Sequence, residues 1–505
     1  MCKPSKRIRG GPRVAAILGL MGLLGGEIAT AADGVTISGY VREHLSFNLE
    51  NPPETTENDR NDLSMARTTL RVDANGKFGE LRYGLIARGS EEVNTSYLKR
   101  LQTLREAGGS TDKLMDQYNT AELREAFVEF DMGDRTTLRL GKQQVAWGET
   151  DFFAGLDVVH GFDFTWRSFL EPENEELRKP LIMANATIQV PEAKGSLQVL
   201  VRPGRKDDDY VGNSYDLFGG RWANQPNKGF DFIGPPGTLV PYNLRHPDGD
   251  TDKTTGGLRW LGRAGPVNYS VAVLRTFNPD PVVNSAFVPF QTTTTKGPLG
   301  EFIYPEVDIL GFTVSGYNQA TDAVWSTEFA YTKDKPYNVG SNFFGGALPG
   351  FGGIIKKDTL RTMFRMDKQL NLQRFIGTSR PSFFSVQLFD SWLTNFNKAE
   401  DIVDLAGYAA LKKEHSTIAT VILAMNYNND RVNPTLALGR DLSYGGGFII
   451  PSVEFAFGNS WRLRAEADIF FDKGDNTTGG NSSNTHLFGY FANNDQLAVR
   501  LTYQF

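Results

Sequence analysis

The stretch that decides the fold is residues 496–505, QLAVRLTYQF, in which apolar and polar side chains alternate up to a terminal phenylalanine. Leu497, Val499, Leu501, Tyr503 and Phe505 form one set, and polar or small residues lie between them. A period of two places the two sets on opposite faces of one β-strand. A soluble β-sandwich also contains such strands, with one face on a core and the other in water. One such strand therefore predicts β structure but does not identify the kind of β fold.

The same alternation recurs along the chain, for example in residues 461–471, WRLRAEADIFF. About eighteen such segments can be counted, although sixteen is also compatible with the pattern, and an even number is required of a barrel with both ends in the periplasm. The predicted strands are residues 35–47, 64–73, 79–88, 120–131, 135–142, 183–191, 195–202, 256–262, 266–275, 307–316, 322–331, 358–368, 381–391, 416–427, 432–441, 446–457, 460–471 and 496–505.

The predicted connections alternate in length. Tight connections rich in Gly, Asn or Asp are expected at residues 74–78, 132–134, 192–195, 262–265, 317–321 and 458–459. Connections of tens of residues are expected at residues 89–119, 143–182, 203–255, 276–306, 332–357 and 472–495. Short periplasmic turns opposite long external loops are typical of outer-membrane barrels, whereas loops of this length are unusual in compact soluble domains.

We therefore predict an all-β protein: a transmembrane antiparallel up-and-down β-barrel that comprises residues 33–505 and carries long external loops. A last strand that ends in an aromatic residue resembles the signal that such barrels present to their insertion machinery. That machinery and outer-membrane lipid are the expected partners.

Residues 1–32 have the pattern of a secretory signal peptide. Five basic residues lie within the first thirteen, residues 14–26 are apolar, and Ala29-Thr30-Ala31 supplies small residues at cleavage spacing. We expect cleavage near Ala31 or Ala32 and delivery to the outer membrane of a Gram-negative cell. A retained N-terminal anchor is the alternative, but the apolar part is shorter than the ~18 residues that span a bilayer.

Composition narrows the function classes. A mean hydropathy of -0.34 is too polar for a helical membrane protein. Cys2 lies in the expected signal peptide, so the mature chain has neither a disulfide nor a thiolate metal site. Without residues 1–32, which contain five basic residues and one acidic residue, the formal charge falls from -6 to -10. Nucleic acid is therefore not an expected partner.

If apolar residues face lipid, the alternate residues face the lumen. The candidate lumen-lining residues are Arg67, Arg71, Arg82, Arg88, Glu125, Glu129, Arg139, Arg462, Arg464, Glu466, Asp468 and Arg500. Facing cations and carboxylates would act either as an electrostatic filter for charged solutes or as a cross-strand ion-pair lattice that satisfies a polar interior.

Signals for an enzyme are weak. The five histidines lack metal-ligand spacing and no serine lies in a nucleophile elbow, so we expect neither catalysis nor a cofactor. Aspartates at 207–209 and at Asp248, Asp250 and Asp252 would bind Ca²⁺ or form a solvated loop. Helical spacing at residues 97–104 and 402–409 predicts short loop helices that either constrict the pore or decorate the surface.

The stretch LRLGKQQVAWGETDFF at residues 138–153, followed by Asp163, resembles a family of Gram-negative outer-membrane proteins labelled as a domain of unknown function. The family has an Asn-Pro pair where this chain has His160-Gly161, so the geometry after Trp147 is expected to differ. Segments near Asn433-Pro434 and within residues 440–471 extend the resemblance over most of the mature chain. Similarity to polysaccharide-export barrels and porins is looser.

The resemblance implies a channel or transport component for a hydrophobic, amphiphilic or polymeric solute, with periplasmic or inner-membrane exporter partners. A surface adhesin or structural barrel, and a lipid-modifying enzyme, are the alternatives. Trp147, Glu149 and Asp151 open a loop of about forty residues and are candidates for a constriction that contacts an amphiphile. Trp147 would equally suit an aromatic girdle at the lipid interface.

Overall fold

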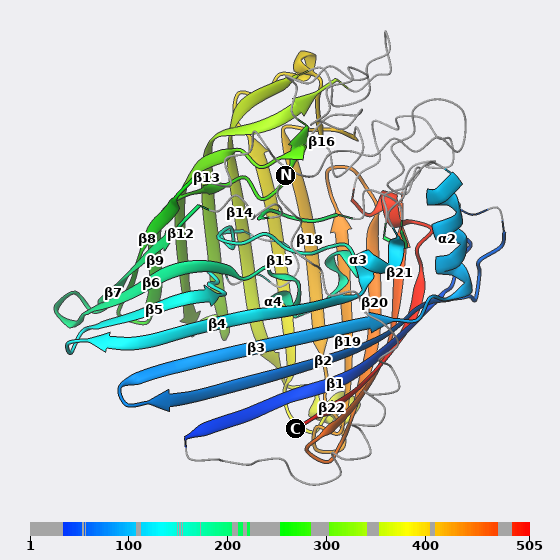
Figure 1. Ribbon diagram of the computed structural model, residues 1–505, viewed down its shortest axis with the longest axis horizontal. Coiled ribbons are helices and arrows are strands. Elements are labelled where there is room, and N and C mark those ends of the chain that lie inside the picture. The colour runs from blue at the N-terminus through cyan, green and yellow to red at the C-terminus, as the bar shows by residue number, and fades with distance from the viewer. Residues whose placement is uncertain are drawn as a thin grey trace, which may run out of the picture.

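The molecule is a closed antiparallel β-barrel of eighteen strands, seen in a computed structural model (Figure 1). Each strand pairs with its neighbours in the sequence order of the barrel strands, and β22 pairs with β1 to close the sheet. The structure describes residues 34–52, 55, 57–107, 113–148, 150, 153, 155–171, 173–204, 211–215, 220–222, 253–283, 302–340, 353–404, 410–472 and 487–505.

All barrel strands except β5 and β7, which have eight residues each, have the ~9 or more residues with which a tilted strand crosses a membrane. The first nine are β1 (Val35–Asn48), β2 (Leu63–Phe78), β3 (Leu81–Glu92), β4 (Thr120–Met132), β5 (Thr136–Gln143), β6 (Leu181–Val190), β7 (Gly195–Arg202), β8 (Thr255–Ala264) and β9 (Val267–Phe277). The other nine are β12 (Glu306–Asn318), β13 (Ala323–Val339), β14 (Ile354–Leu370), β15 (Ser382–Leu393), β18 (His415–Ala424), β19 (Val432–Asp441), β20 (Gly447–Phe457), β21 (Trp461–Phe471) and β22 (Gln496–Gln504).

Alternation in β22 separates an outer apolar face from an inner polar face. Leu497 and Leu501 are each 40% exposed on the outside, whereas Ala498 and Arg500 are 2% and 8% exposed. The same outward exposure of apolar residues occurs on other strands, including Leu258, Leu310 and Phe364. Apolar side chains that remain exposed in a regular band around a closed sheet are those that a lipid bilayer covers.

The eighteen strands predicted from alternation are confirmed, with corrections to their ends. Residues 74–78 were expected to form a turn, but β2 continues through them to Phe78 because they complete the register with β1 and β3. Residues 332–357 were expected to be one long loop, yet β13 and β14 extend into them as a paired ladder.

Most loop elements lie at one end of the barrel or inside it. They include the helices α2 (Ser96–Ala107), α3 (Leu114–Tyr118) and α4 (Asn174–Leu177), the 3-10 turns η1 (Ser168–Leu170), η4 (Lys398–Glu400) and η5 (Gly489–Phe491), and the short strands β10 (Val282–Val283), β11 (Phe302–Ile303), β16 (Ile402–Asp404) and β17 (Ala410–Leu411). At the other end of the barrel are the short turn η2 (Pro191–Ala193) and the helix α5 (Gln373–Ile376). No helix in the described part of the chain is long and apolar enough to cross a membrane.

The helix expected at residues 97–104 is confirmed as α2, but the helix expected at residues 402–409 is wrong where the structure describes it. Ile402 and Val403 pair with Val339 and Asn338 at the end of β13. Because β-branched side chains suit an extended strand, β16 forms there instead.

Candidate functional site: a segment that crosses the lumen

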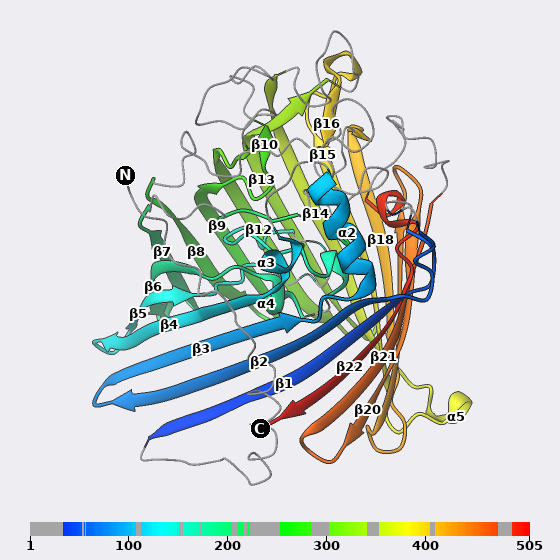
Figure 2. The same ribbon diagram turned by 45° about the vertical axis from the view of Figure 1, so that its right-hand side comes forward.

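The segment 144–180 connects β5 and β6, and its described residues lie inside the barrel; we call this segment the strap. Figures 1 and 2 show α4, which belongs to it, within the ring of strands. At one end of its course the backbone N–H of Leu156 donates to Glu328 of β13 at 2.8 Å. Elsewhere Glu176 accepts a hydrogen bond from the Tyr40 hydroxyl of β1 at 2.7 Å. Since β1 and β13 lie on opposite sides of the closed sheet, the strap crosses the lumen.

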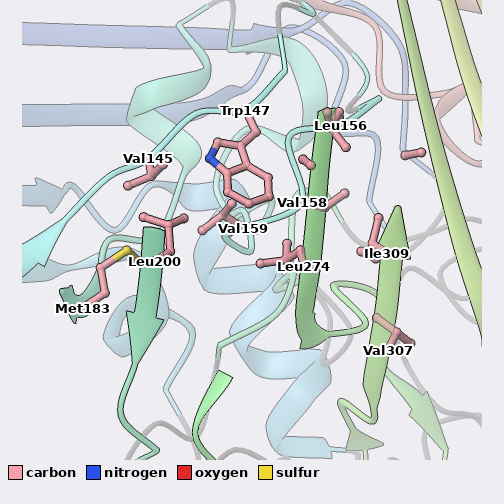
Figure 3. Close-up of a cluster of buried hydrophobic side chains, with 12 residues drawn as sticks. Val145, Trp147, Leu156, Val158, Val159, Met183, Leu200, Leu274, Val307 and Ile309 are labelled. Carbon is pink, nitrogen blue, oxygen red and sulfur yellow. The ribbon is translucent and has the colours of Figure 1, made fainter. Parts of the chain in front are cut away.

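An apolar cluster attaches the first part of the strap to one side of the wall (Figure 3). Its members are Val145, Trp147, Leu156, Val158 and Val159 of the strap and Met183, Leu200, Ala272, Leu274, Val307, Ile309 and Ala330 of strands β6, β7, β9, β12 and β13. Two wall glycines make room for it: a Cβ on Gly311 would lie 2.3 Å from Leu156 Cδ1, and one on Gly257 would lie 3.0 Å from the Trp147 ring. Burial of these side chains favours the folded-in strap.

Trp147 lies inside the barrel and is 1% exposed. Its indole Nε1–H donates to Gln198 of β7 at 2.9 Å, and the Arg259 guanidinium lies 6.0 Å from its ring. Trp147 is therefore not part of a lipid-facing aromatic girdle. Glu149 and Asp151, the other two candidate constriction residues, lie outside the described residues, as do the aspartates at 207–209, Asp248, Asp250 and Asp252.

An aromatic cluster attaches the strap to the opposite side of the wall. The Phe169 ring packs against Phe448 of β20 and Phe470 of β21, each at a centroid distance of 6.0 Å. Phe153 lies 5.4 Å from Phe389 of β15. Edge and tilted contacts of this kind add to the stabilisation from burial.

His160 connects the two ends of the strap. Its Nε2 accepts the backbone N–H of Val145 at 2.9 Å, so its Nδ1 is the protonated nitrogen that donates to the Lys179 carbonyl at 2.8 Å. Burial, together with the nearby Arg178 charge, lowers the pKa of His160 to about 3. The imidazole is thus neutral near pH 7, which this hydrogen-bond pattern requires.

Carboxylates of the strap face arginines of the wall. Glu171 pairs with Arg500 of β22 at 3.0 Å, Glu173 with Arg42 of β1 at 3.5 Å, and Glu175 with Arg71 of β2 at 2.5 Å. Glu176 pairs with Arg88 of β3 at 2.9 Å and with Arg71 at 3.4 Å. Although burial opposes ionisation, Arg88 and the Tyr40 hydroxyl lower the pKa of Glu176 to about 2.

Further charged contacts surround this strap. Arg167 of the strap contacts Glu466 of β21 and donates to His44 of β1 at 3.1 Å. Within the strap, Arg178 pairs with Asp157. Because both partners of each ion pair are largely buried, removing either one would leave an uncompensated charge.

The structure distributes the twelve predicted lumen residues among several environments. Arg71, Arg88, Glu466 and Arg500 contact the strap directly. Asp468 lies 4.0 Å from strap residue Arg167, and Glu125 accepts a hydrogen bond from strap residue Gln144 at 3.2 Å. Arg67 pairs with Glu92, and its guanidinium lies 4.8 Å from the ring of strap residue Trp166. The remaining residues make local contacts: Arg82 and Arg139 with Glu129, Arg464 with Glu466, and Arg462 with the backbone of Gly458.

The sequence prediction missed the partners that the strap supplies. Glu171, Glu173, Glu175 and Glu176 lie in the stretch EPENEE, a run of carboxylates inside a predicted loop, and this run was the available signal. Tyr40 and Arg42 were also missed, although they lie on the inner face of a predicted strand. Among the described residues there is no group of three or more His, Cys, Asp or Glu arranged to hold a metal ion.

A closed barrel with an apolar outer band and a segment folded across its lumen defines a porin-like transmembrane β-barrel. Residues 54–505 match the family model described as protein of unknown function (DUF1302). The chain belongs to that family, and this confirms the family expected from residues 138–153. No curated protein sequence matches the chain.

Three solved structures resemble this chain over nearly its whole length. OccAB1 of Acinetobacter baumannii is 11% identical, with a TM-score of 0.48 and coverage of 95% of this chain and 99% of that chain. A BenF-like porin from Pseudomonas fluorescens Pf-5 is 9% identical, with a TM-score of 0.47 and coverage of 94% and 98%. OpdK of Pseudomonas aeruginosa, solved with vanillate, is 9% identical, with a TM-score of 0.45 and coverage of 94% and 98%.

Proposed function

We propose that the protein is an outer-membrane channel whose lumen the strap narrows and whose solute is amphiphilic. The observation that carries this proposal is the course of the strap, which contacts β1 and β21 on one side of the lumen and β13 on the other. A barrel of sixteen to eighteen strands generally encloses an aqueous passage. An inward-folded segment sets the width and the chemistry of such a passage.

The chemistry around the strap supports an amphiphilic solute. One side of the wall, from β22 to β3, presents Arg500, Arg42, Arg71 and Arg88 to the lumen. Other parts of the wall present apolar side chains, which the strap covers with its Trp147 and Phe169 clusters. A solute with an ionic group and an apolar body would meet both kinds of surface where it displaces the strap.

Single-channel recording in planar bilayers tests the proposal. We expect the wild-type protein to conduct KCl. A variant in which residues 147–177 are replaced by a short Gly-Ser linker should conduct more, because the segment that crosses the lumen is gone. Heat-modifiable gel mobility is the control for a folded barrel. A folded shortened variant with no conductance, or with the wild-type conductance, would contradict a channel narrowed by the strap.

A further inference from the structure

We propose that Arg500, Arg42, Arg71 and Arg88, the arginine row, form a binding site for a solute that carries at least two anionic groups, carboxylate or phosphate. In the present structure four strap carboxylates, Glu171, Glu173, Glu175 and Glu176, occupy this site as an internal ligand. The inference rests on the proposed channel function and names the chemistry of its solute.

The row is built by the register of four successive strands, β22, β1, β2 and β3. Arg500 lies opposite His44, and Arg42 is the next inward position of β1. Arg42 in turn lies opposite Thr69, and Arg71 is the next inward position of β2. Arg71 lies directly opposite Arg88. Since neighbouring strands are about 4.8 Å apart, the row extends roughly 14 Å around the wall.

The wall itself supplies few carboxylates to the row. Arg71 pairs with Asp73 at 2.9 Å and Arg88 pairs with Glu122 at 2.7 Å, but Glu122 is shared with Arg124. In the described part of the chain, the ion pairs of Arg42 and Arg500 are made with the strap. Like charges directly opposite on neighbouring strands are destabilising. The four arginines therefore outnumber the carboxylates that the strands supply, and the row is complementary to a further anionic partner.

A pocket adjoins the row and offers room for a solute group. Its volume is about 380 Å³, and it is lined by Arg42 and Arg71, by Glu173 and Glu176 of the strap, and by Ser38, Gly39, Tyr40, Asp73, Gln504 and Phe505. Ser38 and Gly39 belong to the end of β1 farthest from the strap-bearing loops. A solute can therefore contact two of the arginines without first displacing the whole strap.

The strap carboxylates differ in how readily an anionic solute would displace them from the arginines. The side chains of Glu173 and Glu175 are 48% and 54% exposed, so their ion pairs are screened by solvent and weak. Glu171 and Glu176 are buried and hold the strap more firmly. A multiply charged anion would first replace Glu173 and Glu175 at Arg42 and Arg71. Because it competes with the strap, its binding and strap release are linked reciprocally.

Calorimetric titration of the folded, detergent-solubilised protein tests the site. The probes are citrate, with three carboxylates, pyrophosphate, and acetate as a single-charge reference. In Glu173→Gln/Glu175→Gln the internal competitor is weakened, so the Kd for citrate or pyrophosphate should fall about fivefold, the scale of two partly exposed ion pairs. In Arg42→Gln/Arg71→Gln it should rise at least as much. Acetate should bind weakly to all forms.

Glu192→Gln is the matched control, because Glu192 pairs with Arg135 at an exposed turn away from the lumen at 2.8 Å. Its Kd should equal that of the wild type. Preference for citrate would assign a carboxylate solute, and preference for pyrophosphate a phosphate-bearing one. An unchanged or higher Kd for citrate and pyrophosphate in Glu173→Gln/Glu175→Gln would overturn the proposal. If Arg42→Gln/Arg71→Gln does not fold, the carboxylate variant alone decides. Absence of current in bilayers would instead refute the channel, since calorimetry does not depend on conduction.

Discussion

Glu176 of the strap contacts both Arg71 and Arg88, two arginines that lie directly opposite each other on β2 and β3. Without this carboxylate, two guanidinium groups of like charge would face each other across a strand pair. The inner wall is therefore electrostatically complete only when the strap is folded in. Strap and wall therefore form one electrostatic unit.

Replacing Glu176 with Gln should loosen the strap. The substitution removes one of the two carboxylates that pair with the buried Arg88. Breaking a buried ion pair typically costs about 3–5 kcal/mol, and because Glu122 still pairs with Arg88 we expect a smaller loss. We expect faster proteolysis within the strap and a more frequent high-conductance state, measured on the folded barrel. Glu175→Gln, which alters a half-exposed pair, is the control and should change little. Equal effects of the two substitutions would argue that burial of Glu176 does not matter.

Alternation in the sequence was sufficient to predict the barrel because each strand displays its two faces within ten residues or so. It was not sufficient for the strap. The Leu156–Glu328 hydrogen bond joins residues 172 positions apart, and the Arg167–Glu466 pair joins residues 299 positions apart. Such contacts depend on the closure of the sheet, which no local pattern encodes. The carboxylate run at Glu171–Glu176 was visible, but its arginine partners were not identifiable before the strands were placed in register.

Acidification should weaken the strap through His160. Its pKa is about 3 in the folded strap, below the ordinary value of 6.5, so the released strap binds a proton more readily. The stabilisation from neutral His160 is complete above about pH 6.5 and falls as the pH drops from there towards 3. At pH 5 the loss is about 2 kcal/mol.

The measurement is conductance or strap proteolysis between pH 7.5 and 4.5. His160→Gln keeps a group that can accept from Val145 or donate to Lys179 but cannot titrate, so its response over this range should be flat. Acid opening that persists unchanged in His160→Gln would assign the pH dependence to other groups. Glu176, whose pKa is lowered from the ordinary value of 4.5 to about 2, should contribute mainly below about pH 4.5, where the released carboxyl binds a proton and the folded one does not.

Gly311→Val should push the strap away from β12. A Cβ at this position would lie 2.3 Å from Leu156 Cδ1, so either Leu156 or the wall must move. Overpacking of this kind costs about 1–3 kcal/mol. The barrel should still fold, and the change should appear as altered conductance. Gly316→Val on the same strand is the control, since its Cβ would meet Pro266 at 3.3 Å and not the strap. A wild-type conductance for Gly311→Val would show that Leu156 does not narrow the passage.

Residues 463 and 464 test the assignment of the two faces of β21. Leu463 lies opposite Leu501, which is 40% exposed on the outer face, whereas Arg464 pairs with Glu466 at 2.6 Å on the inner face. Leu463→Arg would place a cation on the lipid side at a cost of about 2–4 kcal/mol near the midplane, and folding should suffer. Arg464→Leu should cost far less and should change ion preference instead.

Single cysteines at these two positions give the sharper measurement, because the sequence has no cysteine besides Cys2. A quencher dissolved in lipid should reach a label at 463, and a water-soluble maleimide should react at 464. A soluble sandwich would also bury Leu463, so a folding defect alone does not separate the two folds. In a soluble sandwich, position 463 would be shielded from lipid probes, and position 464 would face bulk water in the absence of any membrane. That pair of results would contradict the transmembrane barrel.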